Sequence, residues 1–498
     1  MKRPLQITLA IVLTTLDPPP EALNAGGAPK PTMKTLNEVE PRIAIVAGAP
    51  GVSQNANGGY SISGGGSYYL TGHLYVGSGS GIIVGGSRVT LDLNGFDIFC
   101  GSGDVGGYGV ELVDGSEQVV VKNGIIRSGT TRTGAGHPYA FTAHGFTAGV
   151  GGSGAPKDVT ISSLSVRGCA GSGISVESAS VERCRVSACG GTGIVAHAVS
   201  ESVAIQNSDS GIFIVGLGGV RSCTASENGA HGIMNAGTVS QCTASSNGAT
   251  GILGVASVSD SYAVGNGGSG INGGSITNCT AESNHAVGIV GKAVTGCTSS
   301  YNISPSIANT AYGIQARSIS NCTATNNQGH GIVGEFGSVD ACLCLYNSGS
   351  GIWCYDGRVS NSVGSFNNEG ISTAQGSVSN CVVEYNATGG ITAGGCSVSH
   401  STAYRNGTWG INVQGGTATG CTANNNGEFA TPAFFNGAGI KADGGMVTGC
   451  NTRSNKQNGI YAPGGFVTGC TAKGNSQDGG SWSGIYVTGS GGLATNNN

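Results

Sequence analysis

Apolar and polar positions recur at a nearly constant interval through most of the chain. From Gly173 onward a Gly-Ile pair occurs sixteen times, and twelve of the fifteen intervals between these pairs are 18 to 21 residues long. Recurrence at a fixed interval predicts a solenoid in which each repeat forms one turn and stacks on its neighbours. The pairs begin at Gly173, Gly193, Gly211, Gly232, Gly251, Gly270, Gly288, Gly313, Gly331, Gly351, Gly370, Gly390, Gly410, Gly439, Gly459 and Gly484.

A second motif lies between the pairs, and the hexad from Cys242 to Asn247 is a typical copy. A small residue, most often Cys, is followed five places later by Asn in fourteen repeats. The extra residues of long repeats all fall between this Asn and the next Gly. Insertion at one position predicts one column of loops on one side of the stack. The insertions are Ile303–Tyr312, Gly427–Ala438 and Ser476–Ser483.

The runs between Gly and Asn are too short for helices and favour strands. Patterns such as Gly-Ile-x-Val leave no window of ten residues with helical periodicity. We expect an all-β fold, a right-handed single-stranded parallel β-helix of about 19 coils of 18–21 residues. A left-handed β-helix needs a strict hexapeptide period, which the variable repeats break, and parallel crossovers are right-handed. Glycine is expected to supply the corners with positive φ, and Asn to tolerate the left-handed conformation while its amide bonds the next coil.

The N-terminus resembles an export signal. Lys2 and Arg3 precede the apolar stretch Ile7–Leu16, which is too short to span a bilayer. We therefore predict a signal peptide over residues 1–25, with a disordered tail as the alternative. Residues 26–60 are expected to form a linker and N-terminal cap, and residues 61–498 the parallel β-helix.

The first part of the predicted β-helix is less regular than the rest. Val89–Phe96, Val119–Ile125 and Val159–Ile161 look like equivalent strands of successive coils. A Gly-rich excursion, Thr130–Lys157, separates the last two. It contains several aromatic residues, and a cap packed on the stack is favoured over a binding loop. These aromatic residues are His137, Tyr139, Phe141, His144 and Phe146.

Composition and charge exclude several partners. The chain has 93 glycines among 498 residues, only 10% charged residues and a net charge of −4. Strong glycine bias indicates disorder or a repeat fold, and apolar residues in register favour the repeat fold. With no basic run, nucleic acid is not an expected partner. The mature chain has no expected membrane span, and we expect it to be secreted or at the cell surface; its oligomeric state is not predicted.

Three segments carry a resemblance to known proteins. Pro31–Arg42, Gly66–Gly72 and Val89–Phe96 resemble segments of a large, uncharacterised set of exported bacterial β-helix proteins, and the repeats resemble the pectate-lyase-like superfamily more broadly. The resemblance covers nearly the whole chain after the signal. It implies the fold but no single activity, because the superfamily includes lyases, polygalacturonases, epimerases, tailspikes and adhesins.

Most of the seventeen cysteines fall in one column. Ser replaces Cys in this column at Ser261, Ser362 and Ser401, so the position favours a small, weakly polar, inward side chain. We predict a reduced interior ladder in preference to disulfides between adjacent coils. No paired Cys-x-x-Cys motif indicates zinc. The column holds Cys184, Cys223, Cys242, Cys279, Cys297, Cys322, Cys342, Cys381, Cys421, Cys450 and Cys470.

The resemblance implies how a lyase would work on this fold. Polysaccharide lyases of the superfamily hold Ca²⁺ in a carboxylate cluster and use Arg or Lys as the base. The nearest approach to such a set is Asp356, Arg358, Glu369 and Glu384, but these residues occupy different columns and a solvated surface is favoured. Ca²⁺ is implied only for a lyase, and otherwise no cofactor or metal is expected.

One segment matches a polygalacturonase motif. Gly329-His330-Gly331 has the family's Gly-His-Gly sequence, but the accompanying Asn-Thr-Asp, paired Asp and Arg-Ile-Lys motifs are missing. The position of His330 is also variable among the repeats. We therefore do not expect His330 to be catalytic.

An aromatic stripe is the strongest candidate for ligand binding. Tyr346, Phe366 and Tyr385 precede the Asn in three consecutive coils, and Tyr301 holds that place two coils earlier. Polar residues fill the position in other coils, so we predict that it faces water and that its rings bind carbohydrate, with Trp353 and Trp409 close by. An aromatic stack filling the interior, or a local bulge, is the alternative.

Three functions remain open from the sequence. The favoured one is a non-catalytic exported protein that binds a polysaccharide along one side of the solenoid. The alternative is a polysaccharide lyase or glycoside hydrolase acting on acidic polysaccharide. Ice binding is the weakest, because threonines after the Cys form only a partial row.

Overall fold

The computed structural model describes residues 42–497, except for 102, 135–139, 153, 306–310, 429–436, 478–482 and 490. The predicted signal peptide and residues 26–41 of the predicted linker lie outside these residues, as do most of the predicted inserted loops. The stack described below belongs to one unit of the chain, Ile43–Asn498.

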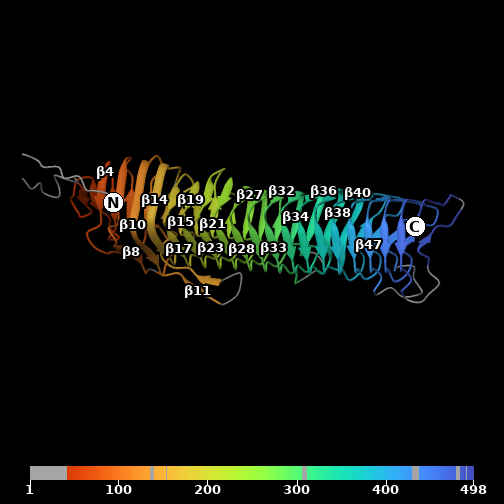
Figure 1. Ribbon diagram of the computed structural model, residues 1–498. Coiled ribbons are helices and arrows are strands. Elements are labelled where there is room, and N and C mark those ends of the chain that lie inside the picture. Colours follow the sequence, from red (N-terminus) through yellow and green to blue (C-terminus); the bar gives the residue numbers. More distant parts are fainter. Residues whose placement is uncertain are drawn as a thin grey trace, which may run out of the picture. The chain divides into compact units, whose positions relative to one another are not determined.

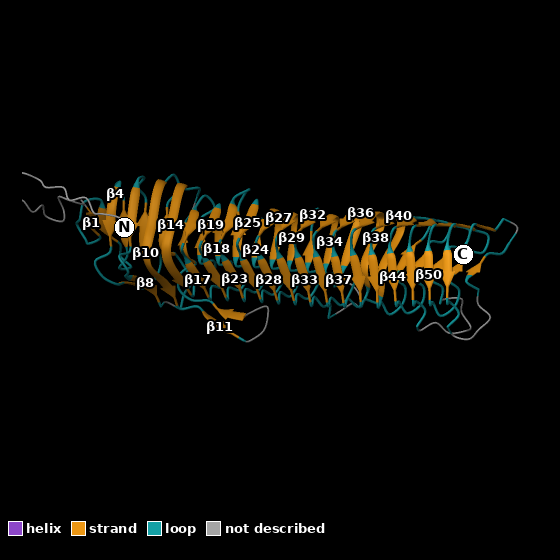
Figure 2. Cartoon of the chain, in the orientation of Figure 1, coloured by secondary structure: helices purple, strands orange, loops and turns teal. Residues whose placement is uncertain are grey.

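The described residues form an all-β parallel solenoid of about 20 turns and contain no helix, which confirms the predicted fold class. Each turn contributes to three parallel sheets, and the turns follow one another in sequence order along the stack (Figure 1). We name the sheets after the residue that each strand typically buries: the isoleucine sheet, the valine sheet and the alanine sheet. In each turn the chain passes from the valine to the alanine to the isoleucine sheet (Figure 2).

The isoleucine sheet contains the Gly-Ile pairs. It consists of β3 (Tyr60–Ile62), β6 (Ile82–Val84), β9 (Tyr108–Leu112), β13 (Ala148–Gly151), β15 (Ile174–Ser175), β18 (Ile194–Ala196), β21 (Ile212–Ile214), β24 (Ile233–Met234), β31 (Ile289–Val290), β42 (Ile391–Ala393), β45 (Ile411–Asn412), β48 (Ile440–Lys441), β51 (Ile460–Tyr461) and β54 (Ile485–Tyr486). Longer strands continue from it into the valine sheet: β27 (Ile252–Ser259), β29 (Ile271–Thr277), β34 (Ile314–Ser320), β36 (Ile332–Asp340), β38 (Ser350–Ser360) and β40 (Glu369–Ser379).

The valine sheet precedes the Cys column. Its other strands are β4 (Gly66–Tyr69), β7 (Val89–Asp92), β16 (Ser180–Glu182), β19 (Ala198–Ser200), β22 (Gly219–Arg221), β25 (Thr238–Ser240), β32 (Ala293–Thr295), β43 (Ser397–Ser399), β46 (Thr417–Thr419), β49 (Met446–Thr448), β52 (Phe466–Thr468) and β55 (Leu493–Thr495). Two strands continue from it into the alanine sheet: β10 (Glu117–Ser128) and β14 (Lys157–Arg167).

The alanine sheet follows the Cys column. Its strands are β5 (Leu74–Val76), β8 (Asp97–Cys100), β17 (Arg185–Ser187), β20 (Val203–Ile205), β23 (Thr224–Ser226), β26 (Thr243–Ser245), β28 (Tyr262–Val264), β30 (Thr280–Glu282), β33 (Thr298–Ser300), β35 (Thr323–Thr325), β37 (Leu343–Leu345), β39 (Val363–Ser365), β41 (Val382–Glu384), β44 (Thr402–Tyr404), β47 (Thr422–Asn424), β50 (Asn451–Arg453) and β53 (Thr471–Lys473).

The predicted early strands are in register. Val119 pairs with Val89 in the preceding turn and with Val159 in the following one. In the region of the predicted cap, β1 covers Arg42–Ala44, and β2 (Val52–Gln54) pairs antiparallel with β3.

The Gly-rich excursion differs from the predicted cap. Its middle is an antiparallel hairpin of β11 (Thr131–Thr133) and β12 (Ala140–Thr142) that stands off the stack (Figure 2). No residue of either strand is buried, so the hairpin does not pack as a cap. The end of the excursion re-enters the solenoid, where Phe146 is fully buried and β13 joins the isoleucine sheet. His137 and Tyr139 lie outside the described residues.

Each turn changes direction at two corners where a residue adopts a left-handed backbone. Gln241 (φ 55°) precedes Cys242, and Ser246 (φ 52°) precedes the ladder residue Asn247. The expectation that Asn itself takes this conformation is therefore wrong. The residue before it does so, and this turns the Asn side chain into the interior while its neighbour points outward. Glycine occupies only some of the corners, for example Gly265.

The glycines of the Gly-Ile pairs are required by close packing, which corrects the expectation that they supply positive φ. A Cβ atom on Gly331 would lie 2.6 Å from the amide nitrogen of Asn347 and 2.6 Å from the carbonyl oxygen of Gly351. Both atoms belong to the next turn. The next turn therefore leaves no room for a side chain at this position.

The asparagine ladder is confirmed. Thirteen successive side-chain amides, from Asn207 to Asn455, each donate to the amide oxygen of the Asn in the following turn, over 2.8 to 3.4 Å. The same oxygen accepts the backbone N–H of the preceding Asn, as in Asn327 to Asn347 at 3.1 Å. Buried polar groups are thus paired along the stack.

The cysteine ladder lines the other corner. All seventeen cysteines are buried and free. The backbone N–H of Cys297 donates to Sγ of Cys322 at 3.5 Å, and this thiol donates to the carbonyl of Ser320 at 3.1 Å. Ser261 makes the same two bonds through its hydroxyl. This shared bonding explains why Ser substitutes for Cys in the column.

Candidate functional site

The aromatic stripe lies at the corner between the alanine and isoleucine sheets. Tyr346, Phe366 and Tyr385 have φ angles of 57°, 56° and 57°, and each precedes a ladder Asn. Tyr301 and Arg405 hold the same position in other turns with φ of 55° and 51°. We call this set of left-handed residues the corner column. Because the following Asn points inward, the corner-column side chains project into solvent.

The rings of the corner column are exposed and stacked. Tyr346 is 55% exposed, Phe366 44% and Tyr385 38%. The ring centroids of Tyr346 and Phe366 lie 4.9 Å apart with planes at 17°, and those of Phe366 and Tyr385 lie 5.1 Å apart at 2°. Tyr404 meets Tyr385 edge-on at 5.7 Å. The three rings therefore face solvent, as predicted, and the alternative of an aromatic stack that fills the interior is wrong.

Backbone preference does not explain aromatic residues at this corner. A left-handed backbone costs a side chain with a Cβ about 1–2 kcal/mol, and Gly or Asn adopts it most readily. Other turns use such residues here, including Gly265, Asn326 and Asn425. Stacking returns about 0.5–1.5 kcal/mol for each ring pair. The aromatic residues are therefore not explained by the backbone conformation of this corner alone.

The stripe ends at a polar depression. The guanidinium of Arg405 lies 5.8 Å from the ring centroid of Tyr385 and 5.6 Å from that of Tyr404. Arg405 also lines a surface depression of about 420 Å³. Its other lining residues are polar: Asn425, Asn426, Glu428, Ser454, Lys456 and Gln477. Hydrogen-bonding groups therefore follow directly after the stacked rings.

Tyr301 stands apart from the three stacked rings. It is 54% exposed, but the next turn places Asn326 between it and Tyr346. The structure therefore brings Tyr346, Phe366 and Tyr385 together and leaves Tyr301 two turns before Tyr346.

The two predicted tryptophans belong to a different part of the turn. Trp353 lies in β38 beside Ile352 and stacks on His330, with centroids 5.5 Å apart and planes at 14°. Trp409 immediately precedes a Gly-Ile pair, and its indole N–H donates to the hydroxyl of Thr392 at 3.1 Å. Both side chains are half-buried and line the isoleucine sheet.

Glu369 lies between these tryptophans along the stack. Its carboxylate accepts hydrogen bonds from the hydroxyls of Ser350, at 3.4 Å, and of Thr392. We call Glu369, Ser350, Thr392, Trp353, Trp409 and His330 the Glu369 cluster. The cluster combines one carboxyl group with aromatic side chains from successive turns.

Burial changes the protonation of two groups in this cluster. It raises the pKa of the Glu369 carboxyl above its ordinary value, although hydrogen bonds from Thr392, Ser350 and Ser372 act in the opposite direction. Burial also lowers the pKa of His330. His330 Nδ1 accepts the backbone N–H of Ser350 at 3.0 Å, as a neutral imidazole does.

Several members of this surface were not singled out from the sequence. Tyr312 packs on His330 at 5.4 Å, Tyr355 contacts Trp353 at 6.2 Å, and Phe336 contacts Tyr355 at 5.7 Å. Tyr312, like His330 and Glu369, occupies the position directly before a Gly-Ile pair, and Thr392 follows one. Reading these two positions down successive repeats would have identified Tyr312 and Thr392, but not Phe336 or Tyr355.

The lyase candidates do not form a cluster. Asp356 and Arg358 lie in β38, beyond its isoleucine-sheet part, and pair with Gln375 and Ser377. Glu369 pairs with Ser350 at the start of the isoleucine sheet, whereas Glu384 lies in β41 of the alanine sheet. Within the described ranges, no three His, Cys, Asp or Glu side chains are placed to hold a metal ion.

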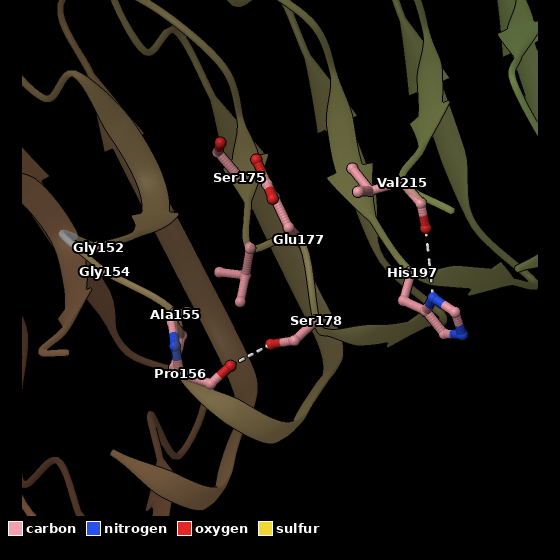
Figure 3. Close-up of a pocket in the computed structure, with 10 residues that line it drawn as sticks. Gly152, Gly154, Ala155, Pro156, Ser175, Glu177, Ser178, His197 and Val215 are labelled. Carbon is pink, nitrogen blue, oxygen red and sulfur yellow. Dashed lines mark hydrogen bonds between the residues drawn. The ribbon is translucent and has the colours of Figure 1, made fainter. Parts of the chain in front are cut away.

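A cavity of about 380 Å³ lies near the first regular turns (Figure 3). The Ser178 hydroxyl donates to the carbonyl of Pro156, and His197 Nδ1 faces the carbonyl of Val215 at 3.3 Å. Glu177 is the one carboxylate in its lining. Since its serine and imidazole are already engaged by the backbone, this cavity presents few groups that converge on a ligand.

The threonine row is interrupted. Thr243 and Thr280 are separated in the alanine sheet by Tyr262, and Leu343 follows Thr323. The regular threonine face that ice binding would need is not continuous here.

No helix within the described residues is long and apolar enough to cross a membrane.

Comparison with known proteins gives structural likenesses only. No protein-family model matches the chain, and no curated protein matches it. It is similar to the A-module of mannuronan C-5 epimerase AlgE6 of Azotobacter vinelandii, with 12% identity over 87% of this chain and 91% of that one and a TM-score of 0.20. A tailspike protein of Escherichia coli bacteriophage HK620 matches with 12% identity over 85% and 74% of the two chains and a TM-score of 0.30. A GH87 alpha-1,3-glucanase catalytic domain matches with 11% identity over 94% and 70% and a TM-score of 0.17.

Proposed function

We propose that this chain is a non-catalytic polysaccharide-binding protein, and that the corner column is its binding surface. Tyr346, Phe366 and Tyr385 pack against the C–H faces of consecutive sugar rings. The hydroxyl groups of the sugar chain then reach the polar depression that begins at Arg405. In this proposal the protein is exported and acts outside the cell or at its surface, as the N-terminal residues predict.

One observation carries the proposal: three exposed, stacked rings are held in a left-handed backbone on consecutive turns. Successive turns lie about 4.8 Å apart and the three rings stack face to face, so their exposed edges form a strip about 10 Å long. A linear polymer with apolar ring faces matches a strip of this shape. A compact small molecule would leave most of it uncovered.

The polar depression supports a polymer with hydroxyl or carboxyl substituents. Arg405 and Lys456 provide two cations at its edge, and Glu428 provides one carboxylate. The amides of Asn425 and Gln477 both donate and accept hydrogen bonds. These groups fix orientation at one end of the strip, while the rings provide contact area.

The test is affinity electrophoresis of the full chain in gels containing alginate or polygalacturonate, whose carboxylates match the cations Arg405 and Lys456. We expect retardation by at least one of these polysaccharides. The double variant Tyr346→Ala/Tyr385→Ala should weaken that binding by at least tenfold, because it removes the two outer rings of the strip.

Tyr75→Ala is the matched control. Tyr75 is 62% exposed and contacts Phe99 near the other end of the stack, so its removal alters an exposed ring pair without touching the corner column. Retardation that is equal in wild type and the double variant would refute the proposal, as would the absence of retardation in both gels.

A further inference from the structure

The Glu369 cluster forms a second surface that the corner column does not include. Its aromatic side chains and its carboxyl group lie on the isoleucine sheet, and none of them belongs to the left-handed corner. Ser350, Glu369 and Thr392 come from three successive turns. This side-chain network spans turns, whereas other repeats place unrelated residues such as Val287, Asn458 and Met234 at these two positions, so the repeat itself does not require it.

The Trp409 indole occupies the space that a side chain at Gly389 would need. Gly389 occupies the position that Glu369 holds in the preceding turn, and a Cβ there would lie 2.3 Å from Nε1 of Trp409. The Trp409 indole therefore leans back over Gly389 toward Glu369. In this position its N–H reaches Thr392, which in turn donates to Glu369. The indole, the hydroxyl and the carboxyl are thus held in a fixed order.

Trp353 lies on the opposite side of Glu369 from Trp409. It stacks on His330 and contacts Tyr355, so its orientation is set by rings on two sides. Trp353 lies one turn before Glu369, and the Trp409 indole covers the turn after it. The two indoles are therefore separated by about 10 Å along the stack, with Glu369 between them.

We propose that the Glu369 cluster is a second carbohydrate site, which takes an uncharged sugar ring between Trp353 and Trp409 with its hydroxyls on Glu369. The two indoles present apolar faces and edges to the C–H groups of the sugar. The carboxyl group and the hydroxyls of Ser350 and Thr392 offer hydrogen bonds to its OH groups.

The charges of the cluster select against acidic sugars. The described partners of Glu369 are hydroxyl groups, and neither Lys nor Arg is among them. Burial also lowers the pKa of His330, which favours its neutral form. A uronic acid in this site would place a second carboxylate beside Glu369 without a cation to pair it. The corner column differs, because Arg405 and Lys456 lie at its end.

The experiment compares neutral and anionic polysaccharides on the full chain. Affinity electrophoresis is run in laminarin, xylan and galactomannan, and separately in alginate and polygalacturonate. We expect retardation in at least one neutral gel. Trp353→Ala and Trp409→Ala should each weaken it at least tenfold, Glu369→Leu should do the same, and Glu369→Gln should preserve it within about threefold because the amide still forms hydrogen bonds.

Two comparisons separate this site from the corner column. Tyr346→Ala/Tyr385→Ala should leave neutral-polymer binding at this site detectable, and Leu217→Ala, at an 86% exposed position, serves as the general surface control. Thermal unfolding of each variant confirms that it is folded. Four outcomes would overturn the inference: no retardation in any neutral gel, retardation only in anionic gels, retardation unchanged in both tryptophan variants, or loss of neutral binding only in the corner-column variant.

Discussion

The rings of Phe366 and Tyr385 lie 5.1 Å apart with their planes only 2° from parallel. This distance is close to the spacing of adjacent strands in a sheet, about 4.8 Å. The solenoid therefore sets the ring separation, and identical backbone conformations at the two residues set the ring orientation. A repeat fold can thus build a regular aromatic surface by placing suitable side chains at one position of each turn.

The backbone conformation of the corner column leads to a stability prediction. The free energy of unfolding of Phe366→Asn should lie within about 1 kcal/mol of the wild-type value, because relief of left-handed strain offsets the lost ring contacts. Phe366→Leu loses the same contacts but retains the strain, so it should be less stable than Phe366→Asn. Thermal unfolding measures both. A leucine variant as stable as the asparagine variant would show that the backbone is not strained.

The glycines of the Gly-Ile pairs should tolerate no side chain. Gly331→Ala places a methyl group 2.6 Å from atoms of the next turn, and we expect a loss of at least 1–3 kcal/mol. Gly394→Ala is the matched control, because a Cβ there meets nothing within 4 Å and the backbone is not left-handed. It should be neutral or stabilise by up to about 1 kcal/mol. Equal effects of the two substitutions in thermal unfolding would contradict the packing argument.

The cysteine ladder should accept serine and reject valine. Cys322→Ser retains an acceptor for the backbone N–H of Cys297 and a donor to the carbonyl of Ser320, so stability should change by less than about 1 kcal/mol. Cys322→Val leaves the buried N–H of Cys297 without an acceptor and should cost about 1–3 kcal/mol. Chemical denaturation distinguishes the two variants. A valine variant as stable as the serine variant would mean that the N–H to sulfur contact contributes nothing.

The buried carboxyl of Glu369 predicts a pH dependence. Its pKa is raised in the folded protein, so the folded state binds the proton more tightly than the unfolded state does. The stabilising contribution is fully present below the unfolded pKa and is lost as pH rises through the folded pKa. The side chain introduced by Glu369→Gln does not titrate. The melting temperature of the variant minus that of the wild type should therefore increase between about pH 4 and pH 7. Since His330 is present in both proteins, its titration cancels; a difference that is constant with pH would contradict the raised pKa.

Much of the fold follows from local pattern. The interval between Gly-Ile pairs predicts the number and stacking of turns, because each short strand can bury its apolar residues only against its neighbours. The Asn and Cys columns are likewise visible in the sequence, and both form interior ladders. The exposure of Tyr346, Phe366 and Tyr385 also follows from the polar residues that fill the same place in other repeats.

Other features depend on contacts between turns. The sequence does not reveal that the left-handed backbone belongs to the residue before each ladder Asn and not to the Asn itself, since a left-handed residue at either place satisfies the same spacing. It also does not reveal that Asn and Gly of the next turn occupy the space that a side chain on the Gly of each pair would need. The hairpin formed by β11 and β12 was likewise unexpected, because its aromatic content favoured a packed cap.

By itself, the sequence determined a parallel solenoid, its two interior ladders and one exposed aromatic column. These depend on periodicity, which is a property of one repeat compared with the next. Only the tertiary structure joined Glu369, Thr392 and Trp409, because they occupy two different positions of the repeat in three successive turns. The indole of Trp409 reaches back across Gly389, and a contact that crosses turns in this way depends on side-chain direction and free space, which column-by-column reading of the repeats does not contain.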